Sequence, residues 1–290
     1  MALKAYLSKD VLTWRRLLLT NGGNQSELDW LLDIGGGLSW VDLQKLYLFP
    51  EEPIELDKSL EELEKIWRLH IDEQKPLQHI IGKCYWRDFQ LEINPDALIP
   101  RQETELLVDF ALEKLDKKFK GSWVDLGTGS GALAVALSRA LSRWDGHVVD
   151  SSQSALSLAK RNLERLSSQS SVQLHLGDWW EPLKDFQGSI DIAISNPPYI
   201  PASILKTLDP IVINHEPKLA LSGGEDGLDA CRKIVFGAVK GLRSGGWLIF
   251  EHHHDQSEKA LQLLKDCGFK DVSFENDFRG VKRFAMGRNS

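Results

Sequence analysis

The sequence predicts an α/β protein with a doubly wound, seven-stranded Rossmann-like sheet, preceded by a small all-helical N-terminal domain and a β-hairpin linker. Two observations predict this fold. Residues 1 to about 72 show only helical spacing of apolar residues, whereas strand-like and helix-like segments alternate after Gly121. We therefore expect a helical domain at 1–75, a loop and hairpin linker at 76–98, and an α/β domain at 99–290.

The composition is that of an ordinary soluble protein. The chain has 290 residues, of which 42% are hydrophobic, and a formal charge of −7. It lacks both an apolar run of the roughly 20 residues that a membrane span needs and a signal-peptide core, so we expect a cytoplasmic protein that binds no membrane. The acidic balance argues against wrapping a nucleic-acid duplex. Cys84, Cys231 and Cys267 lack the spacing of a disulfide framework or a zinc site, and we expect reduced thiols.

The N-terminal segments are predicted to be helices because their apolar residues recur at helical spacing, with Ser26 and Ser39 as candidate N-caps. After them, 76–82 is predicted to be a loop, and alternation around Trp86 and Phe89 predicts a hairpin. A further helix should begin within 98–105, where a proline and acids precede an apolar pattern, and run to about Phe119. The four N-terminal segments are 7–18, 28–32, 41–48 and 57–70.

The alternating part supplies seven predicted strands, the last two forming a closing hairpin. The strands are 123–126, 147–149, 172–176, 190–195, 247–251, 271–274 and 283–286, and helices are predicted at 132–142, 154–166, 229–242 and 257–266. In doubly wound sheets, ligands bind beyond the carboxyl ends of the strands. Gly127, Asp150, Asp178 and Asn196 each follow one of these strands, so we expect them to meet at one edge.

The motif Asn196-Pro197-Pro198-Tyr199 indicates a chemistry. The Asn196 carboxamide oxygen and the Pro197 carbonyl can both accept hydrogen bonds from a planar NH2 group, while the prolines stiffen the turn. Drawing both hydrogens to acceptors helps to turn the nitrogen lone pair out of conjugation, and Tyr199 can cover the flat face of the group. An ordinary strand-to-loop turn has similar residues, so the rest of the chain must decide.

The turn 125–131 places glycines where backbone must approach a ligand closely, and Asp150 follows at the distance that suits ribose hydroxyls. The same glycines fit a dinucleotide fingerprint, which leaves a nicotinamide-dependent enzyme as a rival at this motif. Asp178 and Trp179 near an adenine, together with Asn196 at the next strand, favour methyl transfer from S-adenosylmethionine. A constellation for hydride transfer is lacking.

The combined motifs resemble the N5-glutamine methyltransferases that modify the Gly-Gly-Gln loop of peptide chain release factors. The likeness extends over nearly the whole chain, in segments 76–82, 98–105, 125–131, 177–179, 196–200, 216–217 and 223–228. The resemblance implies a substrate-docking helical domain, a methyltransferase domain, S-adenosyl-L-methionine as cofactor and class I release factors as partners. We expect a monomer that forms no stable complex with nucleic acid.

The resemblance also implies roles for individual residues. The glycine loop would line the methionine part of the cofactor, Asp150 would hold the ribose, and Asp178 or Trp179 would flank the adenine. The candidate cofactor-binding residues are Asp125, Gly127, Thr128, Gly129, Ser130, Gly131, Asp150, Asp178, Trp179 and Asn196. The candidate catalytic residues are Asn196, Pro197 and Tyr199, and these three with Pro198 are the candidate substrate-binding residues.

Two departures from the family pattern concern loops. Gln102 stands where the family usually has proline, and His252-His253-His254 follows Glu251 where a glycine-containing turn is common. Three consecutive residues at a strand end cannot all face one ion, so we expect no metal site and a solvated strand terminus.

Three alternatives stay open on sequence alone. One is a nucleic-acid amine methyltransferase, because adenine N6 presents the same NH2 geometry. Another is a protein that binds the cofactor or a release factor without turnover. The third is a methyltransferase for a glutamine of a ribosomal protein, whose chemistry at the amide is identical.

Overall fold

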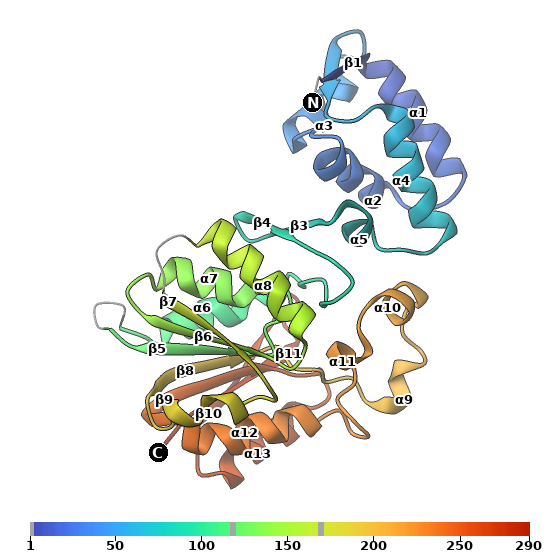
Figure 1. Cartoon of the computed structure of the whole chain (residues 1–290). Helices are drawn as coiled ribbons and strands as arrows, with labels where there is room; N and C mark the ends of the chain where they lie inside the picture. The colour runs from blue at the N-terminus through green and yellow to red at the C-terminus, as the bar shows by residue number, and fades with distance from the viewer. Residues whose placement is uncertain (1–2, 117–119, 168–170) are drawn as a thin grey trace. The chain divides into compact units, whose positions relative to one another are not determined.

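The computed structural model describes residues 3–116, 120–167 and 171–290, which form two compact units, Met1–Cys84 and Tyr85–Ser290 (Figure 1). In the first unit, helices surround a core that includes Leu28, Leu46 and Trp67. Its elements are β1 (Lys4–Leu7), α1 (Ser8–Thr20), α2 (Gln25–Trp30), the π-helical turn η1 (Leu31–Gly35), α3 (Trp40–Leu48), β2 (Pro53–Leu56), α4 (Leu60–Asp72) and α5 (Leu77–Ile81).

The prediction of an all-helical N-terminal domain is wrong in one respect, because β1 and β2 pair as antiparallel strands, with Lys4 opposite Leu56. β1 and β2 have only four residues each and lie far apart in the sequence, so neither strand is long enough to show a clear alternation of polar and apolar residues. Leu7, which ends β1, fits the helical spacing of the segment that follows it. The caps are also corrected in part. Ser39 caps α3 as predicted, but Asn24, not Ser26, caps α2 through a capping box with Glu27.

The segment 76–82 was predicted to be a loop, but Leu77–Ile81 forms the short helix α5. Pro76 precedes its first residue and Gly82 ends it in the left-handed conformation (φ 77°), which are helix boundary signals. The predicted hairpin is present as β3 (Lys83–Trp86) and β4 (Phe89–Glu92).

The second unit is built on a seven-stranded mixed sheet in the order β10-β11-β9-β8-β5-β6-β7, which confirms the predicted fold class. β5 to β9 are parallel, and the closing hairpin β10–β11 runs antiparallel beside β9. The strands are β5 (Ser122–Leu126), β6 (Asp145–Asp150), β7 (Ser171–Leu176), β8 (Ile190–Ser195), β9 (Leu242–Glu251), β10 (Lys270–Asn276) and β11 (Lys282–Arg288).

Helices cover both faces of this sheet (Figure 1). One face carries α6 (Glu105–Glu113), α7 (Ala132–Ala140) and α8 (Gln153–Leu166), and the other carries α12 (Asp229–Gly241) and α13 (Ser257–Asp266). The order of strands reverses between β5 and β8, so the edge beyond these two strands is the place where doubly wound sheets bind ligands.

Helix α6 begins at Glu105 and ends at Glu113, so it is shorter at both ends than the sequence predicts. The predicted end itself, Phe119, lies outside the described residues. The backbone of 98–101 makes hydrogen bonds outside a helix: the Ile99 N–H donates to Glu216 and the Arg101 carbonyl accepts from the Trp86 indole. Four short helices between β7 and α12 were not predicted. They are η2 (Glu181–Phe186), α9 (Ala202–Leu205), α10 (Pro210–His215) and α11 (Lys218–Leu221).

Candidate functional site

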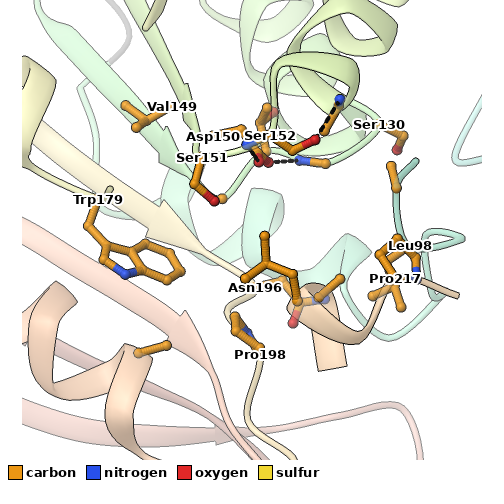
Figure 2. A pocket seen from close by; sticks show the side chains of 18 of the residues that line it. Leu98, Ser130, Val149, Asp150, Ser151, Ser152, Trp179, Asn196, Pro198 and Pro217 are labelled. Carbon is orange, nitrogen blue, oxygen red and sulfur yellow. Dashed lines mark hydrogen bonds between the residues drawn. The ribbon is translucent and has the colours of Figure 1, made fainter. Parts of the chain in front are cut away.

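The carboxyl ends of β5, β6, β7 and β8 border one cavity of about 320 Å³ (Figure 2). In the view of Figure 2, Asp150 lies near the top of this cavity, with Asn196 and Pro198 below it and Trp179 to the left. The strands thus bring together residues that lie far apart in the sequence, as the position of the topological switch point predicts.

The loop after β5 lets backbone border the cavity. Gly127, Gly129 and Gly131 have φ values of 75°, 55° and 82°, a region that L-residues with a Cβ rarely adopt. The N–H groups of Gly127 and Thr128 both donate to the Val149 carbonyl, at 2.9 and 3.0 Å, which ties the loop to β6. A Cβ at Gly131 would lie 3.0 Å from Ala159 on α8, so this glycine allows helix packing rather than ligand approach.

Asp150 ends β6 and orders the loop as well as facing the cavity. Its Oδ2 accepts from the Gly129 N–H at 2.9 Å and its Oδ1 accepts from the Ser152 N–H at 2.9 Å. Burial raises the pKa of Asp150, and these backbone donors oppose that rise. A carboxylate held by backbone donors in a fixed orientation is suited to accept from neighbouring hydroxyl groups of a ligand.

Asp125 has a different position from the one its motif suggests. It is fully buried, accepts from the Thr128 hydroxyl at 2.7 Å, and does not line the cavity. Its Oδ1 is buried without a hydrogen-bond partner among the described residues, and burial raises the pKa of Asp125 to about 7. Asp125 therefore stabilises the glycine loop from the buried side, through its hydrogen bond with Thr128.

Two tryptophans follow β7, and the structure separates their roles. The Trp179 ring lies against the cavity side of the glycine loop, where a Cβ at Gly127 would approach it to 3.1 Å. Trp180 points away: its indole N–H donates to the Ile234 carbonyl, and its ring lies against Gly237 and Gly241 of α12. Trp179 is therefore the aromatic wall of the cavity.

Asp178 and Lys233 form an ion pair at the cavity edge, with Nζ 2.7 Å from Oδ2. The sequence does not identify Lys233 as a site residue, because it is one of several polar residues on α12.

Asn196 enters the cavity at the end of β8 and is oriented by a hydroxyl. Its Nδ2 donates to Thr104 Oγ1 at 3.0 Å, and Thr104 donates to Glu251 Oε2 at 2.8 Å. Tyr199 donates its hydroxyl to the other oxygen of Glu251 at 2.9 Å. The Asn196 Oδ1 is thereby left as an acceptor on the carboxamide.

Glu251 is 1% exposed at the end of β9, and burial raises its pKa, against the opposing influence of the two hydroxyl donors and of the Arg283 charge. The pKa of Tyr199 is raised as well, chiefly by desolvation and then by the neighbouring Glu251 carboxylate.

Most predicted site residues line the cavity: Gly127, Thr128, Gly129, Ser130, Asp150, Asp178, Trp179, Asn196 and Pro198. Asp125, Gly131, Pro197 and Tyr199 lie outside its lining. Thr104 and Glu251 were not predicted as site residues, although Glu251 ends a parallel strand, as the residues predicted from the other strands do. The residues of the 96–100 segment and of α11 that line the cavity were not predicted either.

The prediction of a solvated triple histidine needs correction. His254 is exposed, but His252 is fully buried and His253 is half-buried beside Asp255, which its Nδ1 approaches to 2.6 Å. Their neighbour Gln256 explains the order of this turn, because its side chain accepts from the His253 N–H and donates to the Tyr199 carbonyl.

The cavity fits the cofactor that the resemblance implies. Its volume lies at the lower end of the range for small-molecule sites. It offers a close backbone approach at Gly129, a carboxylate at Asp150 for hydroxyl groups, and the flat indole of Trp179 for a heterocycle. These are the groups that an adenosyl-containing ligand requires.

Comparison with known proteins gives a consistent result. Residues 103–208 match the family described as Methyltransferase small domain. The release factor glutamine methyltransferase of Prochlorococcus marinus is 57% identical over 97% of this chain and 97% of its own length. The proteins of the same name from Synechocystis (36% identical; 95% of this chain and 94% of theirs) and Gloeobacter violaceus (40% identical; 90% and 89%) also match.

Among solved structures, the hMettl16 catalytic domain in complex with MAT2A 3'UTR hairpin 6 superposes with a TM-score of 0.52. It covers 78% of this chain and 80% of that one at 16% identity, which is a likeness of fold alone.

Proposed function

Because the chain belongs to the release factor glutamine methyltransferase family, we propose that it methylates the side-chain amide nitrogen (N5) of the glutamine in the Gly-Gly-Gln motif of class I release factors. The methyl donor is S-adenosylmethionine. The observation that carries the proposal is the orientation of Asn196, whose Nδ2 is engaged by Thr104 so that its oxygen is left to accept from an NH2 group. The modification supports translation termination.

The reaction needs an amide nitrogen to act as a nucleophile, although its lone pair is delocalised into the carbonyl. The Asn196 Oδ1 and the Pro197 carbonyl accept the two N–H hydrogens of the substrate, which fixes the plane of the amide and increases the electron density on nitrogen. Tyr199 packs beside the glutamine side chain and is itself held by Glu251. When bound, the cofactor supplies an electrophilic methyl group.

Rate enhancement then comes from positioning and from electrostatics at the amide, without a strong general base. The nitrogen forms its bond to the methyl carbon as the bond from that carbon to the donor sulfur breaks, and it gives up one of its two N–H protons to solvent during or after transfer. The Asn196 Oδ1 and the Pro197 carbonyl accept from the two N–H groups until that proton leaves. Residues 127–130 of the glycine loop would hold the methionine part of the cofactor, Asp150 would hold the ribose, and Trp179 with Asp178 would flank the adenine. The placement of these residues around the cavity supports this assignment.

We further propose that residues 1–75 form the release-factor docking domain, joined by the 76–98 linker to the methyltransferase domain at 99–290. Helix α3 supports this, because it exposes Trp40, Val41 and Leu48 by 68%, 62% and 69%. All three side chains belong to one nine-residue helix, and contiguous exposed apolar surface is typical of protein-interaction sites.

The enzyme acts as a monomer in the cytoplasm, where release factors work. None of the helices in the described part of the chain is long and apolar enough to cross a membrane.

The proposal is tested by Asn196→Ala, with Asn276→Ala on the exposed end of β10 as the matched control. Methyl transfer to a purified class I release factor is measured with labelled S-adenosylmethionine, and cofactor affinity is measured by calorimetry. Asn196→Ala should abolish transfer and retain cofactor binding, because the glycine loop is untouched. Full transfer by Asn196→Ala would refute the assigned chemistry.

A further inference from the structure

A carboxylate with almost no exposure lies behind the proposed amide-binding residues. Glu251 is 1% exposed, and its two oxygens accept from two different hydroxyls, those of Thr104 and Tyr199. Burying a carboxylate is costly unless hydrogen bonds compensate it. Here the donors are the hydroxyls of Thr104, which also contacts Asn196, and of Tyr199, which is itself a proposed substrate-binding residue.

The hydrogen-bond inventory fixes the direction of this chain of contacts. Thr104 donates its single hydroxyl proton to Glu251 Oε2, and the two hydroxyl donors and the Arg283 charge favour the ionised, acceptor-only form of Glu251 against the effect of burial. The Thr104 oxygen is then available only as an acceptor, and Asn196 must present its NH2 side to it. Consequently the carboxamide oxygen of Asn196, and not its nitrogen, is turned to the substrate side.

A carboxamide has nearly the same shape in its two flipped orientations, so shape alone selects between them poorly. A flipped Asn196 would direct an NH2 group at the NH2 group of the substrate, which repels it and offers no acceptor. The correct orientation therefore needs a polar partner, and Thr104 is the hydroxyl that provides it.

We propose that Glu251 and Thr104 are positioning residues that orient the Asn196 carboxamide through the chain Glu251–Thr104–Asn196, which we call the orienting relay. This inference rests on the proposed function, because it assigns Asn196 the role of amide acceptor. Glu251 also holds the Tyr199 hydroxyl, so one buried charge orders both side chains around the substrate amide.

The relay predicts how conservative substitutions differ. Thr104→Val keeps the shape and removes the hydroxyl, whereas Thr104→Ser keeps the hydroxyl. Glu251→Gln is nearly isosteric but presents an NH2 group to one of its two hydroxyl partners. If that partner is Thr104, the threonine proton is released toward Asn196 and the carboxamide flips. If it is Tyr199, the contact with the tyrosine reverses.

The experiment measures kcat and KM for a release factor, together with calorimetric cofactor affinity and thermal unfolding, for these three variants. Ser138→Ala is the control, because it removes a buried hydroxyl on α7 that bonds the Val135 carbonyl away from the relay. Thr104→Val and Glu251→Gln should each lower kcat by a factor of about 2 to 10, as expected for a lost orienting hydrogen bond of ordinary strength. Cofactor affinity should stay at the wild-type value, and Thr104→Ser should restore most of kcat.

Glu251→Gln can also lower kcat through its contact with Tyr199, so the relay is judged on the two Thr104 variants. Wild-type kcat in Thr104→Val, or equal losses in Thr104→Val and Thr104→Ser, would each overturn the relay. If the wild-type enzyme transfers no methyl group to the release factor glutamine, the proposed function itself fails. An active wild-type enzyme with an equally active Thr104→Val variant refutes only the relay.

Discussion

Asp125→Asn should change how the stability of the fold depends on pH. In the folded chain Asp125 is completely buried and its pKa is about 7, against an ordinary value of 3.8. The folded state therefore binds a proton more tightly than the unfolded state. Below the ordinary pKa both states are protonated and the group contributes nothing. As pH rises from 3.8 toward 7, the unfolded state releases the proton while the folded state retains it, so stability is lost. Above about pH 7 both states are ionised and no further stability is lost.

The magnitude follows from this difference in pKa. A rise from 3.8 to about 7 corresponds to about 4 kcal/mol, fully expressed above pH 7. In Asp125→Asn the titration is absent, so the free energy of unfolding of the wild type minus that of the variant isolates this one group.

The assay is urea denaturation of both proteins from pH 5 to pH 8, followed by tryptophan fluorescence. The difference should fall as pH rises, by about 2–3 kcal/mol over this range. A difference that stays constant with pH, or that rises, would refute the burial argument for Asp125.

Two further predictions concern the cofactor site and α12. Asp150→Ala should weaken cofactor binding by about 1.5–3 kcal/mol in calorimetry, because a carboxylate that also holds the Gly129 N–H is lost, whereas Asp145→Ala at the exposed start of the same strand should not. Unchanged affinity in Asp150→Ala would mean that the ribose site lies elsewhere. Gly237→Ala places a Cβ 2.1 Å from the Trp180 ring and should destabilise the fold by about 1–3 kcal/mol in urea denaturation, despite the better helix propensity of alanine. Wild-type stability there would show that Trp180 is free to move.

The sequence predicts the sheet well because its signals are local. Most of the parallel strands contain a short apolar run followed by a distinctive residue, as at Asp150 and Asn196, so both the strands and the cavity edge could be located. The β1–β2 pair escaped prediction because pairing Lys4 with Leu56 depends on the tertiary arrangement of its unit, not on a local pattern.

The supporting contacts of the site could not be predicted for a related reason. Thr104 and Asn196 are 92 positions apart, and the sequence around each residue does not indicate that their side chains are in contact. Asp125 shows the converse: its motif suggests a ligand contact, but the strand turns its carboxylate into the core. Sequence motifs thus located the residues, and only the packing shows which of them face the cavity.

The most direct test of the assigned function is mass spectrometry of a purified class I release factor after incubation with this enzyme and S-adenosylmethionine. A release factor whose Gly-Gly-Gln glutamine is replaced serves as the control. The account predicts one added methyl group on that glutamine and none on the control. Absence of the methyl group, with cofactor binding verified separately, would contradict the account and direct attention to a ribosomal-protein glutamine or a nucleic-acid amine as the acceptor.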